Sequence, residues 1–307
     1  MPTGQQKMHA FLIFLSTFVI TTTTYAAAYE YNHHSDLVGE LQYHSVRSKD
    51  TWESIGYHYD VGYDELRNAN PHVRSLKSYI GKTLIIPSLH VLPEKKDRYG
   101  IVVNLAEKRL YYFPEEMEIV YTYPISVGKS GWETPMFQGR LVRKKIAPTW
   151  YVPKSIAAYY KKKYNRTLPR YIGPGPKNPL GNYALYTSKG AILIHGTNKE
   201  NLIGRAVSSG CIRMYNRNIQ ELFYLVKVKD QVHFLHVDEK LGLDSGLLYL
   251  EKHQPYFTND TDSLDDQLED FEAEYNLSLK LDKDKVIEQY DVQSGVPNPI
   301  GHVNKSE

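Results

Sequence analysis

Residues 192–214 have the sequence ILIHGTNKENLIGRAVSSGCIRM, and the interpretation of the whole chain starts from this stretch. Its apolar opening predicts a buried strand that delivers His195 to its end, and Gly196 allows the chain a sharp exit. Fifteen residues separate His195 from Cys211. Gly210, immediately before the cysteine, lets the backbone approach a substrate closely. We therefore expect this stretch to bring a histidine and a cysteine together beside exposed backbone N–H groups.

The chemistry that this pair indicates is nucleophilic catalysis by a thiol. Such a reaction needs a thiolate, a base within hydrogen-bond reach and backbone donors for the oxyanion. A nearby protonated histidine would lower the pKa of Cys211 and make it a better nucleophile. The plainer alternative is that His195 and Cys211 are ordinary core or surface residues. The two glycines beside them and the absence of a second cysteine favour catalysis.

Length and composition limit the functional classes. A chain of 307 residues can form two domains, or one domain with appendages. The net charge of +2 provides no strong field for nucleic acid, so no nucleic-acid partner is expected. One cysteine with scattered histidines is too little for a zinc site. We predict neither a cofactor nor a metal.

The N-terminus predicts export. An apolar run of eleven residues, 10–20, is followed by small residues up to Ala28. This pattern is typical of a signal peptide, here residues 1–28, and the run is short for a membrane span. Lys7 is the only Lys or Arg before it, so an uncleaved anchor stays open. In an exported protein, an unpaired Cys211 is a buried hydrophobe, an intermolecular link or a reactive thiol.

A compact unit follows at residues 42–88. A short strand leads to a helix that Thr51 can cap, a second helix ends at Pro71, and an apolar run with Pro87 closes the unit. Its stretches SKDTWESIG, ELRNANP and GKTLIIP resemble the LysM domain. The resemblance implies binding of glycans that contain N-acetylglucosamine. The alternative is a small αβ cap without a ligand.

The central part, residues 99–237, has the composition of strands separated by turns, with one helix at about 218–226. Within it, residues 143–181 are basic and rich in proline and glycine, and we expect a long loop or lid there. The C-terminal extension, residues 238–307, contains eight acidic residues among residues 260–274. We expect that segment to be solvated or disordered, and a last amphipathic helix at about 280–289.

The stretch HGTNKENLIGRAVSSGCIRM resembles the signature of the L,D-transpeptidase catalytic domain of the YkuD type. The order of the LysM-like unit, catalytic domain and C-terminal appendage is similar to that in the enterobacterial ErfK/YbiS/YcfS/YnhG group. The resemblance implies a mainly β chain with a β-sandwich-like catalytic domain. Ser209 departs from the pattern, because the family often has histidine there. This change should spare the core chemistry, since the family's base is the upstream histidine.

The resemblance also implies residue roles. Cys211 would attack the L-centre–D-Ala bond of a peptidoglycan tetrapeptide stem, and His195 would be its base, oriented by the carbonyl of Gly196. Arg213 could hold a stem carboxylate, order the loop or form a structural ion pair. The remaining candidates for the oxyanion hole or substrate binding are the N–H groups of Gly210 and Cys211, and the side chains of Ser208 and Ser209. The two serines could instead cap the turn.

The expected partner is peptidoglycan, and the expected location is the periplasm. The acyl acceptor stays open between a second stem peptide, which gives a 3→3 cross-link, and an amine of an outer-membrane protein or lipoprotein. Water could replace the amine, which would make the enzyme a peptidase or carboxypeptidase. A non-enzymatic wall-binding protein, with the LysM-like unit as its active part, is the alternative from another class.

Overall fold

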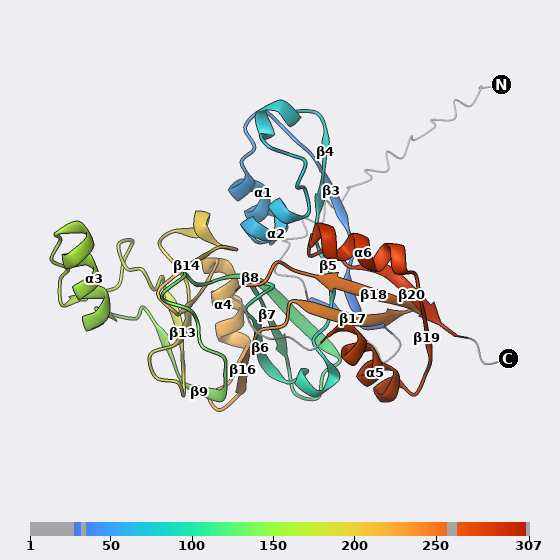
Figure 1. The fold of residues 1–307 in the computed structure, drawn as a ribbon. Coiled ribbons are helices and arrows are strands. Elements are labelled where there is room, and N and C mark those ends of the chain that lie inside the picture. Colours follow the sequence, from blue (N-terminus) through green and yellow to red (C-terminus); the bar gives the residue numbers. More distant parts are fainter. Residues whose placement is uncertain (1–27, 32–34, 257–262, 305–307) are drawn as a thin grey trace, which may run out of the picture.

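The structure is a computed structural model, and it describes residues 28–31, 35–256 and 263–304 (Figure 1). Apart from Ala28, the predicted signal peptide lies outside these residues, and its prediction stays untested. No helix within the described ranges combines the length and the apolar character needed to cross a bilayer.

The LysM-like unit has the predicted order of strand, helix, helix and strand. It consists of β3 (Gln42–Ser45), α1 (Trp52–Tyr59), α2 (Tyr63–Asn68) and β4 (Thr83–Ile86), and β3 pairs antiparallel with β4. Thr51 caps α1 as expected, because its Oγ1 accepts the N–H of Ser54 at 3.0 Å. Trp52, Ile55 and Leu66 are buried in a core of the unit's own. Figure 1 shows the unit standing on the body of the molecule.

The central region is a sheet whose pairings run in a closed circuit. The order is β8-β15-β13-β12-β9-β16-β6-β7, and β7 pairs again with β8. The strands are β6 (Gly100–Asn104), β7 (Arg109–Phe113), β8 (Ile119–Gly128), β9 (Phe137–Ile146), β12 (Tyr183–Thr187), β13 (Leu193–His195), β15 (Ile212–Met214) and β16 (Gln231–Leu235). The prediction of a mainly β chain is confirmed. The expected sandwich is one hydrogen-bonded sheet, because β8 pairs with both β15 and β7.

Shorter strands extend this sheet at β8. They are β1 (Ala28–Glu30) and β14 (Ala206–Ser208). Strands β2 (Leu37–Gly39) and β5 (Leu89–Val91) form a separate two-stranded sheet. Helix α4 (Asn216–Leu225) buries Ile219 and Leu222 in the main core, close to the position expected for a helix. The core side chains of β13 and β15, Ile194 and Ile212, are fully buried there. The sheet thus gives the His195 and Cys211 segments a rigid support.

The basic segment 143–181 contains more structure than the predicted loop. It forms α3 (Lys154–Tyr164) and a pair of short strands, β10 (Trp150–Tyr151) and β11 (Tyr171–Ile172). Helix α3 begins after Pro153 and ends at Asn165, which adopts a left-handed conformation. No residue of α3 is buried, and the helix projects from one end of the molecule (Figure 1). The proline and glycine residues that suggested a loop lie outside the helix.

The C-terminal extension is a small folded unit. Strands β17 (Glu239–Asp244), β18 (Leu247–Lys252), β20 (Asn298–Val303) and β19 (Leu279–Leu281) form a sheet in that order, and α5 (Leu264–Tyr275) and α6 (Lys283–Val292) are its helices. The expectation of disorder over 260–274 was wrong for the residues of α5. Ser263 caps α5, acidic residues fill its first turn, and Leu268 is buried in the extension's core.

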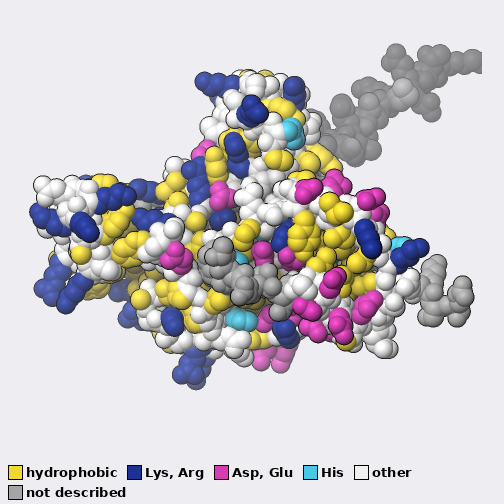
Figure 2. Space-filling view, in the orientation of Figure 1, with side chains coloured by type: hydrophobic (Ala, Val, Ile, Leu, Met, Phe, Trp, Pro, Cys, Tyr) yellow, Lys and Arg dark blue, Asp and Glu magenta, His cyan; other side chains and the backbone are white. Residues whose placement is uncertain are grey.

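Charge is divided between the two ends of the molecule. Lys and Arg side chains gather over α3, and Asp and Glu side chains gather over α5 (Figure 2). The small net charge of +2 is therefore a balance between a basic end and an acidic end.

Candidate active site

Strands β13 and β15 lie side by side and bring the two ends of the decisive stretch together. They pair in parallel, with Ile194 opposite Ile212 and His195 opposite Arg213. Successive side chains of a strand point to opposite faces. Because Ile194 and Ile212 enter the core, His195, Arg213 and the preceding Cys211 share the other face.

His195 is held by the residue that follows it. Its side chain is buried, and Nδ1 lies 2.6 Å from the carbonyl oxygen of Gly196. Since a carbonyl only accepts, Nδ1 carries the hydrogen, and Nε2 of the neutral ring is left as a base. Burial, and next the charge of Arg213, lower the pKa of His195 to about 3, while the bond to Gly196 opposes this shift. The imidazole is thus neutral at neutral pH.

Asn216, at the start of α4, fixes the backbone after His195. Its Oδ1 accepts the N–H of Thr197 at 3.1 Å, and its Nδ2 donates to the carbonyl of Thr197 at 2.8 Å. A Cβ added at Gly196 would lie 2.4 Å from Oδ1 of Asn216. The glycine is required here for this close approach. The sequence analysis did not find Asn216, which no local pattern distinguishes.

The turn before Cys211 is supported by two hydroxyl groups. Ser208 Oγ accepts the N–H of Gly210 at 3.1 Å and donates to the carbonyl of Cys211 at 2.5 Å. Thr134 Oγ1 donates to the carbonyl of Gly210 at 2.9 Å and accepts the N–H of Gly128 at 2.9 Å. Gly210 has a φ of +102°, which favours glycine.

These bonds correct one expectation about the oxyanion hole. The N–H of Gly210 already donates to Ser208, so it is not free for a substrate oxygen. Ser208 is buried and acts as a turn cap, the second of the two roles considered for it. Cys211 N–H is the remaining backbone candidate of the pair.

A tyrosine of the C-terminal extension contacts the residues that support this turn. The hydroxyl of Tyr256 donates to the carbonyl of Gly128 and accepts the N–H of Thr134 at 3.3 Å. Thr134 in turn holds Gly210. Neither Thr134 nor Tyr256 was found from the sequence, because each lies more than forty residues from Cys211 in the chain.

Cys211 is partly buried, and its Sγ lies 3.4 Å from the carbonyl oxygen of Ala191. Burial raises the pKa of this thiol, and a hydrogen bond with the backbone of Leu193 and the charge of Arg213 oppose the rise. The sequence predicts a lowered pKa for Cys211 beside a protonated histidine. Burial instead raises the pKa of the thiol and lowers that of the imidazole, which favours the neutral form of each group.

A cavity of about 360 Å³ lies beside this site, and Ser209, Arg213 and residues of α3 line it. Its walls carry five cationic residues and no Asp or Glu: Lys129, Arg166, Lys177, Lys199 and Arg213. The lining also contains aromatic residues, Trp132, Trp150, Tyr159, Tyr160 and Tyr164. Hydrogen bonds from Lys163 and Lys129 lower the pKa of Tyr159 to about 8. The cavity thus suits an anionic ligand with apolar parts.

Arg213 forms no ion pair among the described residues, and its buried Nε has no hydrogen-bond partner there. The structural ion pair considered for this residue is therefore not found in that part of the chain. A guanidinium largely removed from water and lacking a carboxylate is costly. It is suited to bind an anion that enters the cavity.

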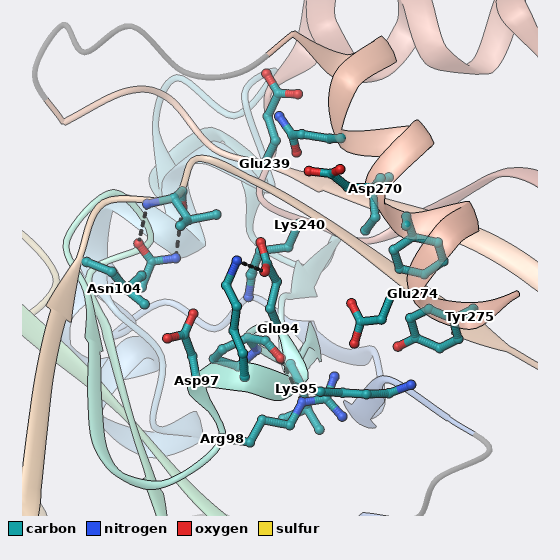
Figure 3. Close-up of a pocket in the computed structure, with 18 of the residues that line it drawn as sticks. Glu94, Lys95, Asp97, Arg98, Asn104, Glu239, Lys240, Asp270, Glu274 and Tyr275 are labelled. Carbon is teal, nitrogen blue, oxygen red and sulfur yellow. Dashed lines mark hydrogen bonds and ion pairs between the residues drawn. The ribbon is translucent and has the colours of Figure 1, made fainter.

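A second cavity, of about 480 Å³, lies between residues 92–98 and α5 (Figure 3). None of the predicted site residues lines it. Its rim carries both signs of charge, including Lys95 and Asp270. Its side chains include no cysteine and no histidine, the residue types expected to act at Cys211 and His195.

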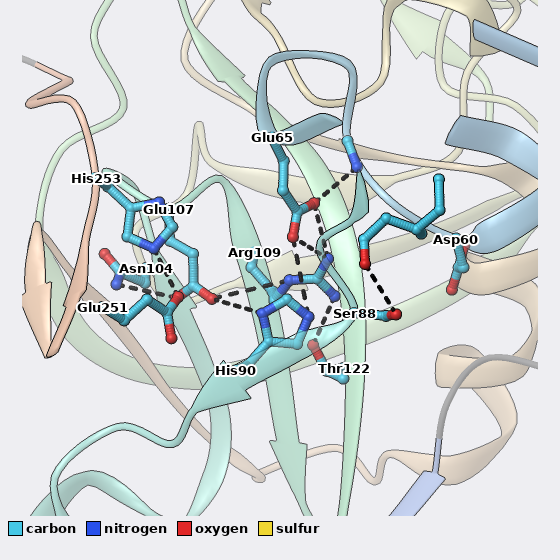
Figure 4. Close-up of polar contacts among 12 residues, drawn as sticks. Asp60, Glu65, Ser88, His90, Asn104, Glu107, Arg109, Thr122, Glu251 and His253 are labelled. Atoms are coloured by element: carbon cyan, nitrogen blue, oxygen red, sulfur yellow. Dashed lines mark hydrogen bonds and ion pairs between the residues drawn. The ribbon is translucent and has the colours of Figure 1, made fainter. Parts of the chain in front are cut away.

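The fold also assembles three side chains that could ligate a metal, His90, Glu107 and Glu251. All three are buried at the junction of the domains (Figure 4). Lys240 Nζ lies 3.0 Å from Glu107 and 3.2 Å from Glu251. The Lys240 ammonium thus lies near both carboxylates, and His253 Nε2 lies 2.6 Å from Glu251, so the donor set does not favour an additional cation.

Comparison with known proteins agrees with this geometry. Residues 98–234 match the model of the L,D-transpeptidase catalytic domain (YkuD), and residues 44–87 match the LysM domain. The probable L,D-transpeptidase ErfK/SrfK of Salmonella typhimurium is 36% identical over 80% of this chain and 81% of its own. The probable L,D-transpeptidase YcfS of Escherichia coli is 34% identical over 86% of this chain and 84% of its own.

Similarity to solved structures is weaker. An L,D-transpeptidase from Mycobacterium smegmatis has 17% identity and a TM-score of 0.35, over 45% of this chain and 58% of that one. Both sequence relatives are at least 34% identical to this chain over 80% or more of its length. The chain belongs to the L,D-transpeptidase family and is a transpeptidase enzyme with a LysM domain.

Proposed function

We propose that this transpeptidase uses Cys211 to attack the L-centre–D-Ala bond of a peptidoglycan tetrapeptide stem. The observation that supports this most is the orientation of His195. Its Nδ1 is tied to the carbonyl of Gly196, so Nε2 is available as a base on the face that Cys211 shares. A neutral thiol and a neutral imidazole on the same face of the sheet suit general-base activation, in which the imidazole takes the thiol proton.

The reaction then has two halves. The thiol proton passes to His195 Nε2 as the Cys211 sulfur bonds to the carbonyl carbon. The C–N bond breaks, and the imidazolium returns the proton to the leaving amine of D-Ala, which leaves a thioester. An acceptor amine attacks the thioester, loses its proton to His195, and Cys211 is released as the thiol. The N–H of Cys211 would stabilise the oxyanion in both halves.

The cationic cavity supports a stem peptide as the donor. Arg213 would bind one of the stem's carboxylates, and Ser209 at the same wall would contact the peptide. Helix α3 would cover the bound stem. The LysM domain would bind the glycan of the same wall, in the periplasm.

The acceptor would be an amine of an outer-membrane protein or lipoprotein, or of a second stem peptide. Mass spectrometry of sacculi from a strain without the protein distinguishes them. Loss of protein-bearing muropeptides indicates the first acceptor, and loss of 3→3 cross-links indicates the second. Loss of tripeptide stems alone would instead indicate transfer to water.

The nucleophile is tested with the purified protein and a disaccharide tetrapeptide. We expect D-Ala release and an acyl adduct on Cys211, both abolished in Cys211→Ala, while wall binding is retained. The substitution removes only the sulfur and should leave the fold unchanged, and retained wall binding shows that the LysM domain of the variant is folded. Continued D-Ala release by Cys211→Ala would disprove the assignment.

A further inference from the structure

The segment between His195 and Cys211 packs against the LysM domain. Its short helix η3 (Glu200–Leu202) is followed by two carbonyls that accept hydrogen bonds from α2. The N–H of Tyr63 donates to Ile203 at 3.1 Å, and the N–H of Asp64 donates to Gly204 at 3.3 Å. The first amide groups of a helix have no partner within it. The catalytic segment thus supplies the acceptors that α2 lacks.

The two backbones are in direct contact at a pair of glycines. A Cβ added at Gly204 would lie 2.1 Å from the nitrogen of Tyr63, and one added at Gly62 would lie 2.9 Å from the Cα of Gly204. Gly204 also has a φ of +87°. Both the conformation and the close contact require glycine there. The contact therefore fixes the backbone of the catalytic segment itself.

The next residue extends the contact through its side chain. Arg205 Nη2 lies 2.6 Å from Glu53 Oε1 of α1, and its guanidinium lies 3.4 Å from the centre of the Tyr63 ring. The chain then enters β14, which pairs with β8 and ends at Ser208, the residue that caps the Cys211 turn. The LysM contact is thus six residues before the nucleophile.

Buried polar contacts hold the LysM domain in this place. Arg109 of β7 donates to both carboxylate oxygens of Glu65, at 2.7 and 2.8 Å, and Glu65 also accepts the N–H of Gly62 at 2.8 Å (Figure 4). On the other side, Asp60 accepts from Asn218 of α4 at 2.7 Å. A module that served only as a tether would need none of these contacts.

We propose that the LysM domain is a positioning element of the active site as well as a wall-binding module. Helix α2 holds residues 203–205, and β14 transmits that position to the turn of Cys211. Acylation of Cys211 therefore depends on the docked LysM domain even when the substrate carries no glycan. The proposal rests on the proposed function of Cys211.

The test uses the full chain and a free tetrapeptide without sugar, so that glycan binding cannot contribute. Glu53→Arg places like charges at the contact and should lower kcat about tenfold with little change in KM, since small misplacement of a nucleophile is costly. Glu53→Arg/Arg205→Glu should recover most of the loss. Arg74→Glu, an exposed charge reversal elsewhere on the domain, is the matched control and should behave as the wild type.

Hydrogen exchange of residues 196–211 provides a second readout, independent of acylation. It should be faster in Glu53→Arg and return toward the wild-type rate in the double variant. Wild-type kcat together with unchanged exchange in Glu53→Arg would overturn the proposal and leave the LysM domain as a tether. A wild-type protein that is not acylated would contradict the role of Cys211, whereas the exchange result would still decide the docking.

Discussion

The LysM domain and the C-terminal extension both contact segments that lead to or support the turn of Cys211, but by different means. The LysM domain contacts the catalytic segment through backbone at Gly204, and its position is fixed by the buried Glu65–Arg109 pair. The extension contacts Gly128 and Thr134 through one hydroxyl, that of Tyr256, and Thr134 in turn bonds to Gly210 in the turn. The first contact constrains the path of the chain, whereas the second supplies single hydrogen bonds. Substitutions in the two should therefore differ in size.

The largest expected effect is at the LysM junction. Arg109→Ala leaves the buried carboxylate of Glu65 without its partner and should lower the free energy of unfolding by about 3–5 kcal/mol. Urea denaturation measures it. Lys108→Ala is the control, since Lys108 pairs with a partly exposed Asp64 at 3.2 Å and should cost about 0–1 kcal/mol. Equal costs for the two variants would show that the buried Glu65–Arg109 pair stabilises the fold no more than the partly exposed Asp64–Lys108 pair.

The next effect is at the residue that links the extension to the turn. Thr134→Val keeps the shape of the side chain but leaves the N–H of Gly128 and the carbonyl of Gly210 unpaired. We expect a loss of about 1–3 kcal/mol in the free energy of unfolding. The acylation rate should fall about tenfold because the Cys211 turn shifts. Unchanged acylation in a destabilised variant would limit Thr134 to a structural role.

Tyr256→Phe should have a smaller effect. It removes the hydroxyl and keeps the ring, and Thr134 still holds Gly210. We expect a cost of about 1 kcal/mol and a fall in acylation rate smaller than that of Thr134→Val. Thermal unfolding and adduct formation measure the two. If both variants lose acylation equally, Tyr256 is the main support of the turn.

The smallest expected effect is that of lowering the pH moderately on kcat/KM. Since the pKa of His195 is lowered to about 3, the base stays unprotonated well below neutral pH. The profile of kcat/KM should then show no acid limb from His195 between about pH 5 and 7. Thr134→Val and Tyr256→Phe should lower the rate by the same factor across this range, because neither side chain contacts the imidazole. An acid limb near pH 6 would show that the imidazole is less buried in solution.

The two flanking regions also differ in how well their folds could be predicted. The LysM domain was predicted element by element, because Thr51, Pro71 and the apolar spacing are local features. The acidic helix α5 was missed, because its charge masked the spacing of Leu264, Leu268 and Phe271, which pack on the extension's sheet. Helix formation there depends on that sheet, as is usual for a helix that gains stability from tertiary packing.

The sequence by itself determined the mainly β fold, the LysM domain, the family and the choice of His195 and Cys211 as the candidate pair, because each follows from residues close together in the chain. Only the tertiary structure decided the neutral state of that pair, the use of Gly210 N–H by Ser208, and the roles of Asn216, Thr134 and Tyr256 as supports. Burial and hydrogen bonds between distant segments depend on which surfaces meet, and no local pattern encodes that. The contact of the LysM domain with Gly204 belongs to the same class.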